Sequence, residues 1–168
     1  MEIDLRLIEQ VLTGEKEAFN QLVINYSAYV YRTAFVFLRN ESEAEDASQE
    51  IFLKVYRSIH RLKDIKAFPA WFKKVITTVC LDRMKGKQLD LDPDIESIPT
   101  TAADHWERRI EFREALGKLS AEERQIIILF DWQGYSYQEI ATLLEIPLGT
   151  VKSRLHAARM RLRTLLSD

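Results

Sequence analysis

Hydrophobic positions recur about every three to four residues along almost the whole chain, and glycine and proline are scarce. This spacing is typical of amphipathic helices and predicts an all-α protein. In the first half it predicts helices over about Leu5–Thr13, Glu17–Leu38 and Glu43–Arg61, and a fourth that begins at Phe68-Pro69 and runs to about Lys85. A first small helical domain is therefore expected over residues 1–87.

Local signals mark the ends of these helices. Gly14 and Gly86 follow the first and fourth helices, and glycine commonly ends a helix. Ser42 and Glu45 have the spacing of a capping box, which predicts that Ser42 caps the third helix. The apolar residues expected on the buried face of that helix and just after it are Phe52, Val55, Ile59 and Leu62.

Residues 88–104 break the periodic pattern with two prolines and five acids: Asp90, Asp92, Asp94, Glu96 and Asp104. This composition predicts a flexible acidic linker. The second small domain is then expected over residues 105–168, with helices over about His105–Leu116, from Ser120 to Trp132, over Tyr137–Leu144 and from Pro147 to Leu166. The Ser120/Glu123 and Ser136/Glu139 pairs predict capping boxes for two of these helices.

The last two helices have the length and spacing of a helix-turn-helix. Ile140, Ala141, Leu144, Val151 and Leu155 would pack its corner. The longer helix contains five basic residues and no acid over residues 147–163, which suits a nucleic-acid partner. We expect its DNA-binding side chains to be Thr150, Lys152, Ser153, Arg154 and His156, with Arg159 further along at a phosphate.

The composition of the chain argues against several classes of protein. The single cysteine, Cys80, excludes an internal disulfide, and the three histidines lie far apart in the sequence. No cluster of catalytic residue types and no metal-ligand spacing is found, so we expect no enzyme activity, no metal and no cofactor. No apolar run reaches about 18 residues and no signal peptide is seen, which predicts a cytoplasmic protein that does not insert into a membrane.

Two stretches together resemble a known family. The run EAFNQLVINY followed by AEDASQEIFLKVYRSIHRLKDIKAFPAWFKKVITTVCLDRMK resembles the promoter-melting domain of extracytoplasmic-function sigma factors of the sigma-70 superfamily. LSAEERQIIIL followed by YSYQEIATLLEIPLGTVKSRLHAARMRL resembles their C-terminal DNA-binding domain. The resemblance covers roughly residues 15–166, with the two domains in the family's order.

The resemblance implies a transcription initiation factor with two macromolecular partners, core RNA polymerase and promoter DNA. Asp46, Gln49 and Glu50 would bind a coiled coil of the largest polymerase subunit, and their spacing places them on one helix face. The fourth helix and the loop of about residues 64–70 before it would capture the melted −10 element. The candidate residues for that contact are Phe68, Trp71, Lys73, Lys74, Thr78 and Arg83.

The last helix would read the −35 element. At two positions the chain departs from the family, which often has Asn at position 78 and a basic residue at position 157, where this chain has Thr78 and Ala157. The family commonly has an inhibitory anti-sigma factor, so such a partner is expected. The alternative is a one-component helix-turn-helix regulator, which would need a sensing or dimerisation domain in residues 1–87.

Overall fold

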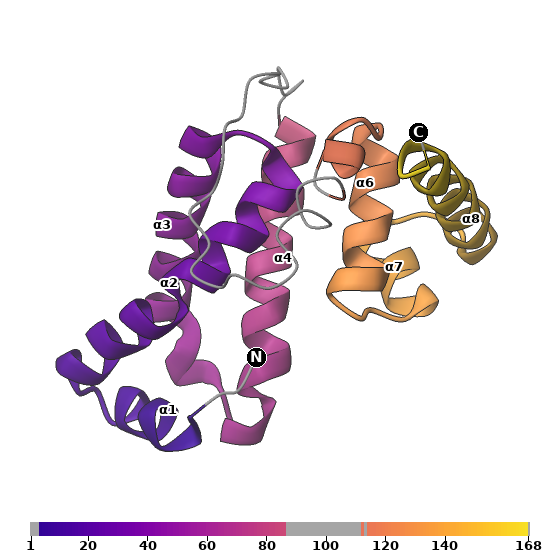
Figure 1. The fold of residues 1–168 in the computed structure, drawn as a ribbon. Coiled ribbons are helices and arrows are strands. Elements are labelled where there is room, and N and C mark those ends of the chain that lie inside the picture. Colours follow the sequence, from indigo (N-terminus) through magenta and orange to yellow (C-terminus); the bar gives the residue numbers. More distant parts are fainter. Residues whose placement is uncertain (1–3, 87–111, 113, 168) are drawn as a thin grey trace. The chain divides into compact units, whose positions relative to one another are not determined.

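The structure, a computed structural model, describes residues 4–86, 112 and 114–167. All regular secondary structure in these residues is helical, which confirms the predicted fold class (Figure 1). The chain divides into two compact units, Met1–Asp92 and Pro93–Asp168. The division falls within the expected linker, residues 88–104, which lies outside the described residues. None of the described helices combines the length and the apolar character needed to cross a bilayer.

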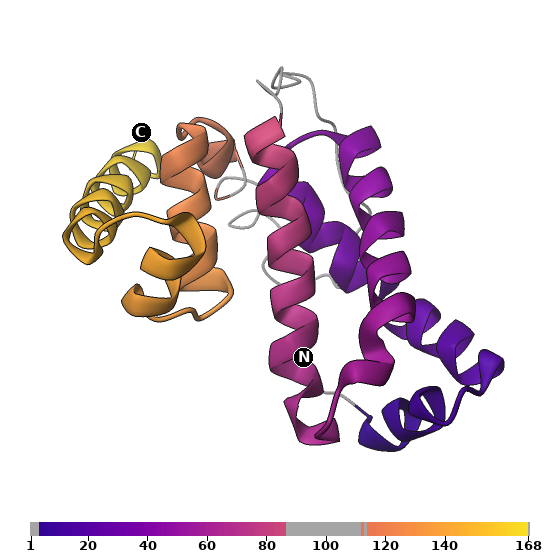
Figure 2. The same ribbon diagram turned by 180° about the vertical axis from the view of Figure 1, so that it is seen from behind.

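The described residues of the first unit, 4–86, form four α-helices: α1 (Leu5–Leu12), α2 (Lys16–Leu38), α3 (Glu41–Ser58) and α4 (Phe68–Gly86). Two short 3-10 turns, Ile59–Arg61 and Ile65–Ala67, connect α3 to α4. Helix α2 packs against α1, α3 and α4, and α3 also packs against α4. Seen from behind, α3 and α4 run beside each other for much of their length (Figure 2).

The predicted start of the third helix was wrong by two residues. Asn40, not Ser42, is the cap, because its side-chain oxygen accepts the backbone N–H of Glu43 at 2.9 Å. Asn40 is extended, and the preceding residue Arg39 ends α2 in the left-handed conformation (φ 54°). The chain reverses there within two residues, so α3 begins earlier than the Ser42 pattern indicated.

Aromatic rings fill the core of the first unit around the start of α4. Phe68 and Phe72 are both fully buried, and their ring centroids lie 5.3 Å apart. Tyr26 of α2 meets Phe72 edge-on at 5.8 Å. Val55 and Ile59 are buried as expected, whereas Phe52 and Leu62 are only half-buried. This packing fixes α4 against α2 and α3.

In the second unit, described helical residues 114–117 precede α6 (Ala121–Ile127), α7 (Tyr137–Leu144) and α8 (Leu148–Leu165). Most of the helix expected over His105–Leu116 lies outside the described residues. The helix expected to reach Trp132 does so, but its last five residues, Ile128–Trp132, form a π-helical turn. The N–H of Gln133 bonds to the carbonyl of Ile128 at 2.8 Å and closes that wider turn.

The helix-turn-helix is present as predicted. Ile140, Ala141, Val151 and Leu155 are buried between α7 and α8, and Leu144 is half-buried. Glu145 ends α7 in the left-handed conformation (φ 55°), which allows the sharp turn to Pro147, the residue that precedes α8. Both predicted capping boxes, at Ser120 and Ser136, are confirmed.

Substitution of Ser136 tests the contribution of its cap to α7. The Ser136 hydroxyl accepts the Glu139 N–H at 3.3 Å, and the Glu139 carboxylate accepts the Ser136 N–H at 2.8 Å. Ser136→Ala is therefore expected to lower the free energy of unfolding of the second unit by about 1 kcal/mol. Ser136→Thr, which keeps the hydroxyl that accepts the Glu139 N–H and donates to the Glu139 carboxylate, should lose less than half of that. Chemical denaturation of the full chain measures both; equal losses in the two variants would contradict a capping role.

Candidate functional site

One face of α3 carries a continuous exposed surface, which we call the α3 face: Asp46, Gln49, Leu53 and Tyr56. All four side chains are exposed, and Leu53 and Tyr56 keep 55% and 57% of their accessible surface. Their spacing along the helix, three or four residues at each step, aligns them. The polar residues Asp46 and Gln49, predicted from the sequence, are therefore followed on the same face by the apolar residues Leu53 and Tyr56, one to two turns further along the helix.

Leu53 and Tyr56 are exposed apolar residues of this face that the sequence analysis did not single out. Their spacing from Gln49 in the sequence places them on the same helix face, but an apolar residue in an amphipathic helix is ordinarily assigned to the core. Their exposure follows from the packing of Ile51 and Val55, which are fully buried on the opposite side. Tyr56 is steadied by Phe19, whose ring meets it edge-on at 5.0 Å.

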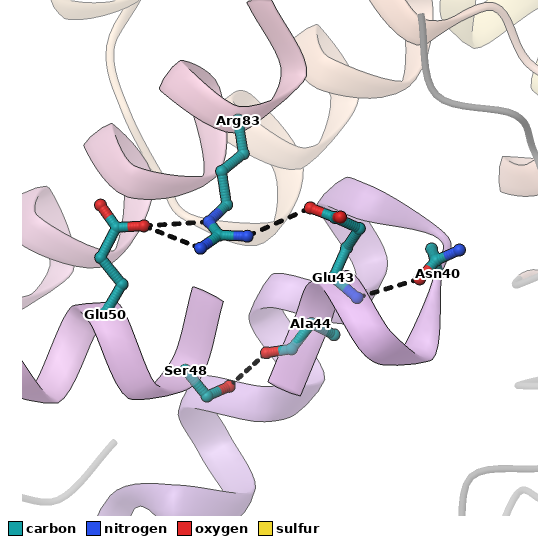
Figure 3. Close-up of polar contacts among 6 residues, drawn as sticks. All are labelled: Asn40, Glu43, Ala44, Ser48, Glu50 and Arg83. Atoms are coloured by element: carbon teal, nitrogen blue, oxygen red, sulfur yellow. Dashed lines mark hydrogen bonds and ion pairs between the residues drawn. The ribbon is translucent and has the colours of Figure 1, made fainter. Parts of the chain in front are cut away.

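Glu50, the third predicted polymerase-binding residue, lies at the edge of the α3 face and is only half exposed. Arg83 of α4 reaches it from the neighbouring helix, with Nε 3.0 Å and Nη2 3.0 Å from Glu50 Oε2 (Figure 3). The same guanidinium donates from Nη1 to Glu43 Oε2 at 3.1 Å. Lys54 lies 3.6 Å from the other Glu50 oxygen, Oε1.

The charges of this cluster affect two ionisable groups. Burial alone would lower the pKa of Arg83, but the hydrogen bonds and charges of Glu50 and Glu43 outweigh it and raise that pKa above its ordinary value. Burial raises the pKa of the nearby Cys80 thiol to about 12, an effect that Arg83 reduces and Glu50 increases. Arg83 is thus a permanent cation and Cys80 an unreactive thiol at neutral pH.

The predicted −10 residues of α4 divide into buried and accessible side chains. Phe68 is fully buried, so in this structure its ring offers no surface to a base. Trp71 is half-buried beside Phe68, with ring centroids 5.8 Å apart, and Lys74 is exposed. Lys73 is half-buried, and the Thr78 hydroxyl donates to the carbonyl of Lys74 at 2.8 Å.

On α8, three predicted DNA-binding residues form an exposed strip: Lys152, Ser153 and His156. Among the described residues no acidic side chain is ion-paired with Lys152 or His156. The Lys152 ammonium lies 6.0 Å from the centroid of the Tyr137 ring, and the Ser153 hydroxyl donates to the Thr150 carbonyl at 3.1 Å. We call Lys152, Ser153 and His156 the recognition strip.

Three of the four arginines of α8 instead have acidic partners within the unit. Arg154 is 3.2 Å from Glu122, and Arg161 is 3.7 Å from Glu123. Arg159 donates two hydrogen bonds to Asp131, which raise its pKa above the ordinary value, and its guanidinium lies 5.0 Å from the Phe130 ring centroid. These pairs are partly exposed to solvent, so each contributes little to the stability of the unit.

No group of three or more His, Cys, Asp and Glu side chains that could hold a metal ion occurs in the described ranges. The described surfaces are an acidic and apolar helix face in the first unit and a basic helix in the second.

Comparison with known proteins also divides the chain into two domains. The sequence model described as Sigma-70 region 2 matches residues 22–89, and the one described as Sigma-70, region 4 matches residues 109–162. The ECF RNA polymerase sigma factor SigM of Mycobacterium tuberculosis is 30% identical over 165 residues, which cover 97% of this chain and 84% of that protein. SigW of Bacillus subtilis is 30% identical over 178 residues, covering 96% of this chain and 95% of that protein.

Solved structures give the same result. CnrH, solved in complex with the cytosolic domain of CnrY, matches with a TM-score of 0.61 and 25% identity and covers 98% of this chain and 97% of its own. RpoE of Bartonella quintana, solved with the anti-sigma factor NepR, matches with a TM-score of 0.64 and 27% identity over 89% of this chain and 96% of its own. Because both domains and nearly the whole length agree, the chain belongs to the family of ECF RNA polymerase sigma factors, which direct transcription to promoters.

Proposed function

We propose that this sigma factor binds core RNA polymerase through the α3 face and Glu50, captures the melted −10 strand with α4, and reads the −35 element with the recognition strip. The observation that carries the proposal is that Lys152 and His156, at base-reading positions of α8, are exposed and have no ion-pair partner among the described residues. Arg154, Arg159 and Arg161, in contrast, are each paired with an acid. The two surfaces lie on separate units, in the order of the family's two domains.

The polymerase interface is supported by the composition of the α3 face. An acid and an amide suit a basic partner surface, and the adjoining leucine and tyrosine supply apolar area that becomes favourable once it is buried. Binding sites between proteins typically combine an apolar centre with a polar rim. Leu53 and Tyr56 would form that centre, and Asp46, Gln49 and Glu50 the rim.

The −35 contact is supported by the position of the recognition strip within the first half of α8. A recognition helix presents its N-terminal turns to base edges in the major groove. Lys152, Ser153 and His156 can donate there to guanine or adenine acceptors. Ala157, where the family often has a basic residue, leaves these three with a larger share of the contact.

The −10 contact rests on α4 and the residues just before it. Trp71 has partial exposure for stacking, and Lys73 and Lys74 can follow the strand backbone. Phe68 would support Trp71 from the core instead of touching a base. The Thr78 hydroxyl already donates to a backbone carbonyl, so it would contribute mainly as an acceptor.

Neutralising both Lys73 and Lys74 is expected to impair promoter opening more than initial promoter binding. Cations beside the melted strand act mainly after the strand has been released. Permanganate footprinting of holoenzyme carrying Lys73→Gln and Lys74→Gln should show several-fold less opening, with little change in closed binding. A control with Lys16→Gln and Lys118→Gln removes two exposed lysines elsewhere. Equal opening in both variants would mean that the α4 lysines do not contact the strand.

A protein partner is supported by the neighbours in the structural comparison. RpoE was solved with the anti-sigma factor NepR, and CnrH with the cytosolic domain of CnrY. We propose that an anti-sigma factor restrains this protein in the cytoplasm and covers at least one of the two surfaces described above. Purification of the chain from its own cells, with and without added core polymerase, would test for a protein that core polymerase displaces.

A one-component regulator is the alternative, and it is not favoured. It would need a sensing domain where residues 22–89 match sigma-70 region 2. Gel filtration discriminates the two: a sigma factor co-elutes with core polymerase, whereas a one-component regulator elutes at its own size.

A further inference from the structure

Arg83 was expected to follow the DNA backbone, but its surroundings do not suit that task. Its guanidinium lies between the carboxylates of Glu43 and Glu50, and Nε, Nη1 and Nη2 are all used on them (Figure 3). Only 24% of the side chain is exposed. A phosphate would have to compete with both carboxylates for this guanidinium.

Glu43 holds the far side of the guanidinium. Its own position is fixed, because its backbone N–H is bound to the Asn40 cap and its side chain is only 14% exposed. Arg83 is therefore anchored at one end before it reaches Glu50. The bridge joins the last turn of α4 to the first turn and the middle of α3, across 40 and 33 residues of sequence.

At the other end Arg83 occupies only one oxygen of Glu50. Both Nε and Nη2 point to Oε2, while Oε1 faces Lys54 at 3.6 Å. The Glu50 side chain keeps 40% of its surface exposed. A flexible glutamate is thus held in one orientation and still offers an accessible acceptor at the edge of the α3 face.

We propose that Arg83 is a positioning residue for polymerase binding: anchored by Glu43, it fixes the Glu50 carboxylate in the orientation that core RNA polymerase binds. Ordering a long side chain in advance lowers the entropy lost when the complex forms. Arg83 then serves the α3 face and not the −10 strand. This inference rests on the proposed polymerase interface and adds to it a residue from the neighbouring helix.

The test is a double-mutant cycle on the full chain, with affinity for core RNA polymerase as the readout. Arg83→Gln and Glu50→Gln are each expected to weaken binding by about threefold to tenfold, because a partly exposed charged contact contributes modestly. The double variant should bind no more weakly than Glu50→Gln alone. If Arg83 only stabilised the fold, its loss would add fully to that of Glu50→Gln.

Two further variants sharpen the test. Glu43→Gln, which loosens the anchor without touching Glu50, should reproduce part of the Arg83→Gln loss. Arg83→Lys keeps the charge but cannot reach both carboxylates at once, so it should recover only part of the affinity. Full recovery by lysine would overturn the positioning role, because a single point charge would then suffice.

The salt dependence of −10 strand binding separates this role from a DNA contact. Saturated holoenzyme with Arg83→Gln should bind a single-stranded −10 oligonucleotide with an unchanged salt slope. A slope smaller by about 0.7 would show a lost phosphate contact and overturn the inference. If Glu50→Gln has no effect while substitutions at Asp46 and Gln49 do, the inference fails but the interface stands; if none of them has an effect, the proposed interface itself fails.

Discussion

A chain that carries Asp46→Lys and Gln49→Lys is expected to bind core RNA polymerase at least about a hundredfold more weakly than the parent, with its helical fold intact. Both side chains are exposed on the α3 face and belong to no ion pair among the described residues. Their replacement therefore costs the folded chain little. At a basic partner surface, however, the two lysines would be repelled where Asp46 was attracted. Placing like charges together across an interface commonly weakens the free energy of binding by several kcal/mol.

The matched control is Glu17→Lys with Gln21→Lys, an acid and an amide that are exposed on α2. It makes the same change of charge away from the α3 face, so it should leave polymerase affinity within about twofold of the parent. Circular dichroism checks the fold of both variants, and titration of labelled core polymerase gives the affinities. Equal affinity of the α3 variant and its control would remove this face from the interface.

Alanine substitutions in the recognition strip are expected to change which −35 bases are preferred. A lost base contact costs roughly 1–3 kcal/mol and relaxes selection at one base pair, whereas a lost phosphate contact weakens all sequences alike. Lys152 and His156 are one turn apart and, among the described residues, have no ion-pair partner that DNA would have to displace. Lys152→Ala, Ser153→Ala and His156→Ala should each relax a different position.

Arg161→Ala is the contrasting variant, because Arg161 lies further along α8 and is paired with Glu123. It should weaken binding uniformly or have no effect, without changing base preference. Transcription from a library of randomised −35 elements, with polymerase carrying each variant, measures preference directly. Unchanged preference for all three strip variants would mean that the recognition strip does not read DNA.

Much of the fold could be predicted because its signals are local. The spacing of apolar residues predicted the helices, and the Ser120 and Ser136 capping boxes form as their sequences indicated. The errors came where two local signals compete. Asn40 and Ser42 can both cap a helix, and the left-handed residue before Asn40 decided in its favour. Nothing in the run Ile128–Trp132 indicated a π-helical turn.

The site was less predictable, because partners of charged side chains come from tertiary packing. Arg83 is a basic residue in a basic window, so the sequence favoured a DNA contact. Only the packing of α4 on α3 reveals Glu43 and Glu50 beside it. Phe68 likewise has a residue type that suits base stacking, but it lies in the core. Residue type and spacing predicted which helices carry the candidate sites, and burial and pairing show which of their side chains are exposed.

The most direct test of the account is transcription by core RNA polymerase reconstituted with this chain on fragmented genomic DNA from its own cells, with every transcript start mapped. We predict start sites that require the added chain and share two short upstream elements at constant spacing, near −35 and −10. A start pattern identical to that of core polymerase alone would contradict it.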